Sequence, residues 1–507
     1  MTAGTAASQP AARGAVGPAE GRSAVDVVRS AVGAIRPRPR WRESMLLGAV
    51  AVALLIGSLS LGTTRSWQAA SAPGATGSPQ LQLADARQLA IFLGLFLVVH
   101  LAQILTGRRT DQVLVPAVAM LGGIGLLLME RLPQGLAGSL GGLSQTQLTW
   151  WVFAAAIMGT LGIVVRSVAW RRLCKYSWAA LGIALLLLTF VFGEEVNGAR
   201  LTLSLGPASF QPSELLKVIL VVFLAGYLSE WRPLLAAADT RLGPLRLPPV
   251  PYLVPMAAMW AIALAIVVIQ RDLGAALLFF AVFLLMLFIA TARWSYVVLG
   301  LIFFAAGAYV AYLLFEHVRT RVDIWIDPWS APLGDGYQVI QGLIAFARGG
   351  LVGTGLGGGL PVVDGRLPIP AIHTDFPLAA LGEELGLIGI LAILGLYLVI
   401  IERGLRIAAA AADEFRALLA AGLALVIGVQ AFIIAAGNLK LIPLTGITLP
   451  FISYGGSSLI ANAVVIGLLL AISDRGVEPP PAPRPSRVAA PEATGPKRVG
   501  PPIEADR

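Results

Sequence analysis

The longest polar segment of this chain runs from residue 316 to 375 and interrupts an otherwise apolar sequence. It opens with EHVRTRVDIWIDPWSAPLGDGYQ, continues through a glycine-rich run and closes with LPIPAIHTD. Its carboxylates and histidines are residue types that carry acid–base chemistry. Long loops between apolar segments tend to be functional. We therefore expect the chemistry of this protein beneath or within this loop.

A second polar segment, NGARLTLSLGPASFQPSELLK, covers residues 197–217. Pro212 is typical of the first position of a helix, which places Glu214 and Lys217 on one helical face. Two interpretations remain open. One is a capped helix with a surface ion pair, and the other is an outward-facing polar pocket in which Lys217 and Arg200 bind an anion.

Further charged residues border or enter the apolar runs. Arg271 belongs to a short charged hinge, which by itself indicates a simple turn. His373 and Asp375 close the long loop, and Glu383 and Glu384 follow inside the next apolar run. Two adjacent acids in a membrane-spanning helix are costly unless they are paired or hydrated. They indicate either a functional role or a satisfied intrahelical network.

The last polar segment, PLTGITLPFISYGGSS, covers residues 443–458. Its two prolines and its paired glycines predict an irregular start followed by a tightly packed helix. Ser453 and Tyr454 lie in this segment, where a role in helix packing and a direct ligand role fit the pattern equally well.

The composition excludes a soluble globular protein. Of the 507 residues, 57% are hydrophobic and 13% are charged, and the mean hydropathy is +0.80. Soluble domains carry about 25% charged residues. Apolar runs of roughly 17–25 residues, the length that crosses a bilayer, recur throughout the chain. Because lipid admits only helices or closed barrels, the sequence predicts an all-α, polytopic helical membrane protein.

We expect about twelve membrane-spanning helices, with the long loop between the ninth and the tenth. The predicted spans cover residues 44–62, 87–106, 112–129, 150–166, 178–192, 214–230, 251–269, 273–291, 296–315, 376–401, 417–436 and 452–473. Arginines such as Arg108, Arg172 and Arg403 gather in alternate short connections. By the positive-inside rule both termini are then cytoplasmic, and the long loop faces outward. The net charge of +9 follows from this bias and is no evidence for nucleic acid.

The two terminal segments differ in composition from the rest. Residues 1–43 are rich in Ala, Gly, Pro and Ser and end in RPRPRWR, and residues 476–507 are rich in Pro. Both are expected to be disordered cytoplasmic tails, and the basic cluster before the first span can contact anionic lipid. No cleavable signal peptide is predicted. The single Cys174 excludes an intramolecular disulfide and a cysteine-based metal site.

Five separated motifs resemble one family. They are NGAR with SFQPSELLK, QRDLGAA, DPWSAPLGDGYQ with GGLVGTGLG, HTDF with GEELGLIG, and PLTGITLPFISYGGSS. In this order they are similar to the SEDS proteins (shape, elongation, division and sporulation; the FtsW/RodA/SpoVE group). That family usually has ten spans. Residues 111–475 therefore resemble the family core, and residues 44–110 resemble two extra N-terminal helices, as in some RodA-like members.

The resemblance implies a peptidoglycan glycosyltransferase that polymerises lipid II at the outer face of the bacterial cytoplasmic membrane. It also implies a role in cell elongation or division and cell shape, with a class B penicillin-binding protein as partner. Transfer from a polyprenyl-pyrophosphate donor needs a base for the acceptor hydroxyl. It also needs cations for the pyrophosphate, either side chains or a divalent ion such as Mg²⁺ or Mn²⁺. The substrate-binding residues implied are Arg200, Gln211, Glu214, Lys217, Arg271, His373, Asp375, Glu383, Ser453 and Tyr454.

The chain departs from the family at the position of the essential acid. The family pattern W-x-D-P-x-G-x-G-Y-Q aligns Ala331 with that acid, and alanine cannot accept a proton. Asp327 and Asp335, four residues to either side, are the candidate catalytic substitutes. Each also fits a turn beside a proline or a glycine.

Three functions follow from this pattern. The leading one is a lipid II polymerase with a relocated acid. The second is a flippase that moves the lipid-linked precursor across the membrane, using the same cavity and cations without a base. The third is a catalytically silent scaffold for a penicillin-binding protein, which the retained HTDF, GEELG and SYGGSS motifs weaken.

Overall fold

The chain folds into a bundle of long helices. The computed structural model describes residues 37–71, 77–133, 135, 142–165, 175–196, 199–205, 208–236, 240–242, 245–247, 272–359 and 367–474. The long helices are α2 (Trp41–Ala70), α3 (Ala86–Leu105), α4 (Leu114–Arg131), α5 (Leu143–Val164), α7 (Lys175–Phe192), α8 (Pro212–Ala236), α10 (Leu273–Thr291), α11 (Trp294–Leu314), α14 (Pro377–Ala409), α15 (Glu414–Asn438) and α16 (Gly456–Ser473). Between α11 and α14 lie α12 (Glu316–Ile326), the 3-10 turn η2 (Pro328–Ser330) and α13 (Tyr337–Gly349).

Ten of the described helices are long and apolar enough to cross a membrane. They coincide with ten of the predicted spans, and α10 has the predicted bounds. The predicted span at 178–192 falls within α7, whereas the predicted span at 251–269 lies outside the described residues. The prediction of a polytopic helical membrane protein is confirmed.

Short strands, which the apolar runs do not predict, connect some of the helices. β1 (Glu194–Val196), β2 (Ala199–Leu205) and β3 (Ala208–Phe210) form an antiparallel sheet between α7 and α8. β4 (Thr240–Leu242) and β5 (Leu245–Leu247) pair after α8. The polar segment before Pro212 is therefore partly a small sheet, in which the strands satisfy each other's backbone groups.

Helix α8 is the most buried of the spanning helices. In its apolar stretch 94% of the residues are buried, whereas none of the corresponding stretch of α11 is buried. α8 packs against α7, α10, α15 and α16. Small residues permit close approach elsewhere in the bundle: Gly404 of α14 faces Ala424 of α15, and Gly422 faces Met286 of α10. In lipid, such close van der Waals packing is a main source of helix association.

The first helix is anchored to the core at its N-terminal end. α2 begins at Trp41, three residues before the predicted span, and Arg40 is buried beside it. Arg40 pairs with Glu43 and donates hydrogen bonds to carbonyl oxygens of the loop 108–111. Glu43 also accepts a 2.7 Å hydrogen bond from Nδ1 of His100 on α3. The end of the RPRPRWR cluster is thus part of the folded bundle.

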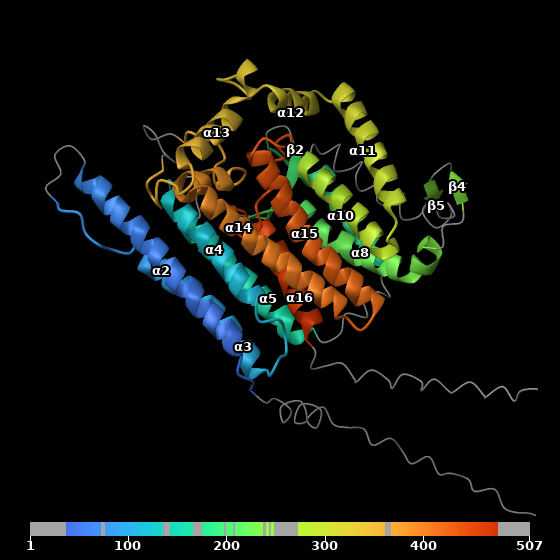
Figure 1. Ribbon diagram of the computed structural model, residues 1–507, viewed down its shortest axis with the longest axis horizontal. Helices are drawn as coiled ribbons and strands as arrows, with labels where there is room; N and C mark the ends of the chain where they lie inside the picture. The colour runs from blue at the N-terminus through green and yellow to red at the C-terminus, as the bar shows by residue number, and fades with distance from the viewer. Residues whose placement is uncertain are drawn as a thin grey trace, which may run out of the picture.

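The other end of α2 contacts the glycine-rich run of the long loop. The hydroxyl of Thr64 donates to the carbonyl of Leu356 at 3.2 Å, and the amide of Gln68 donates to the carbonyl of Gly357 at 3.1 Å. In Figure 1, α2 and α3 lie at one edge of the bundle, and α12 and α13 lie across one end of it. Helix α2 therefore contacts the loop as well as the core.

The glycine-rich run 349–359 packs backbone to backbone against α14. Gly386 interrupts that helix with φ 66° and ψ −169°, a conformation that is essentially restricted to glycine. At this break the N–H of Leu387 donates to the carbonyl of Gly350 at 2.9 Å. A Cβ atom at Gly386 would collide with the backbone of Gly353. The break in α14 thus lets the glycine-rich run pack directly against this helix.

Substituting Gly386→Ala is expected to lower the free energy of unfolding by at least about 2 kcal/mol, because this backbone conformation alone costs about 1–3 kcal/mol for other residues. Gly395→Ala in the same helix is the matched control, since nothing lies within 4 Å of an added Cβ there. The control is expected to be neutral or stabilising by about 0.5–1 kcal/mol. Thermal unfolding of the purified variants checks this, and equal midpoints for the two variants would contradict it.

Candidate functional site

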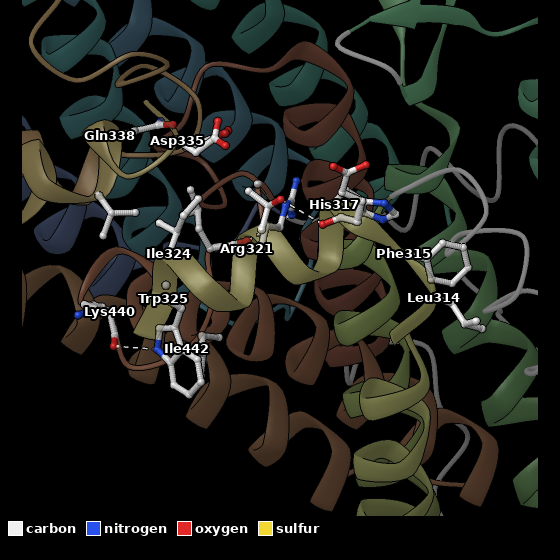
Figure 2. A pocket seen from close by; sticks show the side chains of 17 residues that line it. Leu314, Phe315, His317, Arg321, Ile324, Trp325, Asp335, Gln338, Lys440 and Ile442 are labelled. Carbon is white, nitrogen blue, oxygen red and sulfur yellow. Dashed lines mark hydrogen bonds between the residues drawn. The ribbon is translucent and has the colours of Figure 1, made fainter. Parts of the chain in front are cut away.

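A cavity of about 810 Å³ lies beneath α12, beside the segment that begins α13 and the loop after α15. Figure 2 shows Arg321 of α12, Asp335 of the turn before α13, and Gln338 of α13 among the side chains that line it. Asp375, which precedes α14, and Lys440, which follows α15, also line this cavity. Glu316 lines it as well, so the long loop and the segment after α15 bring three acids and two cations to one polar space.

Arg321 sits at the floor of the cavity. Its Nη1 donates to the carbonyls of Leu444 and Thr445 at 3.3 and 3.1 Å. A Cβ atom built on Gly446 would lie 3.9 Å from both Arg321 Nη2 and Asp375 Oδ2. Burial lowers the pKa of Arg321, and the negative charges of nearby acids oppose this shift. Burial raises the pKa of Asp375, opposed by a hydrogen bond from Thr374 and by the charge of Arg321.

Of the three positions considered for the base, Asp335 is the one that lines the cavity, and its side chain is exposed there. The side chain of Asp327 instead caps η2, accepting a 3.1 Å hydrogen bond from the N–H of Trp329. The carbonyl of Ala331 accepts hydrogen bonds from the N–H groups of Gly334 and Gly336. The turn centred on Ala331 thus presents Asp335 to the cavity.

A buried polar cluster lies deeper in the bundle. Nζ of Lys217 on α8 donates to Glu214 at 2.7 Å, to Gln430 of α15 at 2.8 Å and to Asn462 of α16 at 2.9 Å. An ammonium group has three donors, and all three are used here. The expectation of a surface ion pair is wrong, because Lys217 and Glu214 are both buried. The expectation that Lys217 binds an anion does not match this geometry, because no donor remains.

A smaller cavity of about 50 Å³ joins this cluster to the loop. Gln211, Glu214, Lys217 and Asp272 line it, and Gly446 lines both this cavity and the larger one. The side-chain amide of Gln211 donates to the hydroxyl of Ser213 at 3.1 Å. The buried cluster therefore lies directly next to the floor of the larger cavity.

His373, Ser453 and Tyr454 join the end of the long loop to the segment before α16. The hydroxyl of Ser453 donates to the carbonyl of Thr374 at 2.7 Å, and the N–H of Tyr454 donates to the carbonyl of His373 at 2.8 Å. The rings of His373 and Tyr454 lie 5.8 Å apart. Burial lowers the pKa of His373. In the structure these residues hold two loops together and do not line the larger cavity.

The two adjacent acids of α14 are paired with cations from other segments. Glu383 lies 3.6 Å from Arg348 of α13, and Glu384 lies 3.3 Å from Arg131 of α4. Arg131 also donates to two carbonyls of the glycine-rich run, those of Gly357 and Gly359. The network is therefore not intrahelical: it ties α4, α13 and the glycine-rich run to α14.

Two predicted site residues fall outside this geometry. Arg271 lies outside the described residues, and of Arg200 the structure describes only the backbone, in β2. Among the described residues, no group of three His, Cys, Asp or Glu side chains is arranged to hold a metal ion, so the divalent cation stays a prediction. Gln430 and Asn462 were not predicted as site residues from the sequence. Both are isolated polar residues within apolar runs, a pattern that often marks functional positions.

The fold and the site define a class of protein: a polytopic helical membrane protein with a polar cavity covered by one long loop. Residues 111–476 match the FtsW/RodA/SpoVE family, described as cell cycle proteins. The chain belongs to this family.

Named relatives agree with this assignment. Peptidoglycan glycosyltransferase RodA of Mycobacterium tuberculosis is 42% identical over 391 residues, which cover 75% of this chain and 82% of the relative. A probable peptidoglycan glycosyltransferase FtsW of Nitrosococcus halophilus is 37% identical over 376 residues, covering 72% and 92%. A chain in a solved peptidoglycan synthase complex superposes with a TM-score of 0.57 at 30% identity, covering 72% of this chain and 98% of that one.

Substituting Lys217→Met is expected to lower the free energy of unfolding by about 3–5 kcal/mol, because Glu214 is left as an unpaired buried charge. The double variant Glu214→Gln/Lys217→Met removes both charges and is expected to recover at least half of this loss. Thermal unfolding of the detergent-purified protein measures both variants. A double variant as unstable as the single one would show that the ion pair is not what holds this cluster.

Proposed function

We propose that this protein is a peptidoglycan glycosyltransferase that polymerises lipid II at the outer face of the bacterial cytoplasmic membrane. Its family and the names of its relatives support the activity. The main structural support for the proposal is that Asp335 and Arg321 line the same polar cavity. The arginine-rich alternate connections support cytoplasmic termini and an outward-facing cavity.

Asp335 is the proposed base. Glycosyl transfer forms a bond between the acceptor hydroxyl oxygen and the anomeric carbon of the donor, and it breaks the bond from that carbon to the pyrophosphate oxygen. The hydroxyl proton must pass to an acceptor, and a positioned carboxylate typically contributes about 10²–10⁴-fold to such a step. Asp335 is exposed to the cavity, whereas Asp327 caps a turn and Ala331 has no acceptor on its side chain.

Arg321 and Lys440 are the proposed partners of the pyrophosphate. The leaving group carries negative charge that grows as the anomeric bond breaks, and fixed cations stabilise it. Arg321 is held by two backbone carbonyls through one nitrogen, and the planar guanidinium has further donors for phosphate oxygens. Lys440 lies on the same cavity wall.

A class B penicillin-binding protein is the proposed partner in the membrane. The solved neighbour belongs to a complex that coordinates polymerisation and crosslinking, which supports such an association. A polymerase makes glycan strands and a penicillin-binding protein crosslinks them, so the two activities act on the same product.

Substituting Asp335→Asn is expected to lower the rate of glycan synthesis from lipid II by about 10²–10⁴-fold, because the base is lost. Asp327→Asn is the matched control and is expected to retain most of the activity, because its side chain caps η2. Gel analysis of glycan strands made by the purified protein with its penicillin-binding partner measures both.

Two results would overturn this assignment of the base. One is full activity of Asp335→Asn, and the other is polymer from Ala331→Asp with none from the wild type, which would reveal a degenerate site. If lipid II crosses proteoliposomes while no polymer forms, the protein is a flippase.

Substituting Arg321→Gln is expected to lower the rate of polymerisation by about 10²–10³-fold, as for other donors that stabilise a developing anion. Arg319→Gln on the same helix is the control, since Arg319 packs near the ring of Tyr312 and does not line the cavity. The same gel assay applies, with the unfolding midpoint measured beside it. Equal losses in the two variants would argue against a specific role for Arg321.

A further inference from the structure

A second large cavity, of about 640 Å³, opens at the other end of the bundle. It lies between the start of α2, the connection from α3 to α4, and the ends of α14 and α16. α14 runs from one cavity to the other, because Asp375 precedes its first residue and Arg406 lies in its last turn. Its continuous part after the break at Gly386, residues 387–409, spans about 35 Å. The second cavity is therefore at the opposite membrane surface from the site described above.

The lining of this cavity is rich in arginine. It contains four arginines and two aspartates, namely Arg42, Arg109, Arg403, Arg406, Asp111 and Asp474. Both acids are already paired: Asp111 with Arg403 at 2.8 Å, and Asp474 with the buried Arg108 at 2.6 Å. Arg42 and Arg109 are exposed and form no ion pair with the described residues. Their two positive charges are left to attract an anion.

The two exposed arginines are held in a fixed relation. Arg109 donates its backbone N–H to Asp474 at 3.0 Å. The buried Arg40, two residues before Arg42, donates to three carbonyls of the loop that carries Arg109. Glu43 and His100 in turn hold Arg40 in place. A site that needs little ordering on binding keeps more of its interaction free energy as affinity.

The position of the cavity relative to the membrane surface indicates its ligand. Trp41 lines it and is 70% exposed. Tryptophan is enriched at the level of the lipid headgroups. Guanidinium groups bind phosphate oxygens through paired, charge-assisted hydrogen bonds. We propose that this cavity binds the phosphate of an anionic phospholipid headgroup, with Arg42 and Arg109 as its direct contacts.

The test uses the full-length protein in detergent, with bound lipid counted by native mass spectrometry during titration with phosphatidylglycerol. Arg42→Gln/Arg109→Gln is expected to bind roughly 30-fold more weakly than the wild type, because each cation near an anionic headgroup contributes about fivefold. Arg232→Gln/Arg416→Gln removes the same charge at the same end of the bundle, from pairs with other acids, and is expected to bind normally. Titrations with phosphatidylcholine and with inorganic phosphate complete the experiment.

Several outcomes would overturn the proposal. Unchanged affinity in Arg42→Gln/Arg109→Gln is one, and an equal loss in Arg232→Gln/Arg416→Gln is another, because it would indicate unspecific attraction to basic protein. Equal binding of phosphatidylcholine would remove the need for an anionic lipid, and displacement of the lipid by inorganic phosphate at equal concentration would identify free phosphate as the ligand. If the double variant does not fold, Arg42→Gln alone is expected to lose about fivefold.

Discussion

A hydrocarbon environment offers no hydrogen bonds, so every polar group in the interior of this bundle has to find its partner within the protein. Lys217 meets this requirement with three acceptors from α8, α15 and α16. Arg131 meets it with an acid of α14 and two loop carbonyls. Each of these two cations thus fixes several segments relative to one another. Lys217 thereby joins α8, α15 and α16 beside the floor of the larger cavity.

The polar side chains of the protein fall into two groups, those with hydrogen bonds inside the bundle and those that face the larger cavity. The buried cluster uses all three donors of Lys217 within the protein, and Ser453 and Tyr454 donate to backbone carbonyls at the end of the long loop. Arg321 and Asp335 instead leave polar atoms facing the cavity above. Electrostatic stabilisation of a transition state requires polar groups that are held in place at the cavity. Such groups do not have to reorganise during the reaction step.

The spans were predictable because length and hydropathy decide them, as the agreement over residues 273–291 illustrates. The site was predictable only in part. A pattern shows that Asp327 and Asp335 flank Ala331, but which of them faces the cavity depends on the turn that the Ala331 carbonyl stabilises. Arg321 is one of several charges on a polar helix, and only the return of the loop onto the bundle distinguishes it. Short strands such as β2 were also not predicted, because strand formation here depends on pairing with a neighbouring strand and not on hydropathy.

Helix α2 has 30 residues and no break, so it is about 45 Å long and exceeds the thickness of the hydrocarbon core. Its first turn is tied to the loop 108–111, and its far end is tied to the glycine-rich run through Thr64 and Gln68. A stiff rod fastened at both ends transmits a small axial or tilting displacement from one membrane surface to the other. Helix α2 therefore links segments at the two ends of the bundle directly, independent of α8, α15 and α16, which enclose the buried cluster.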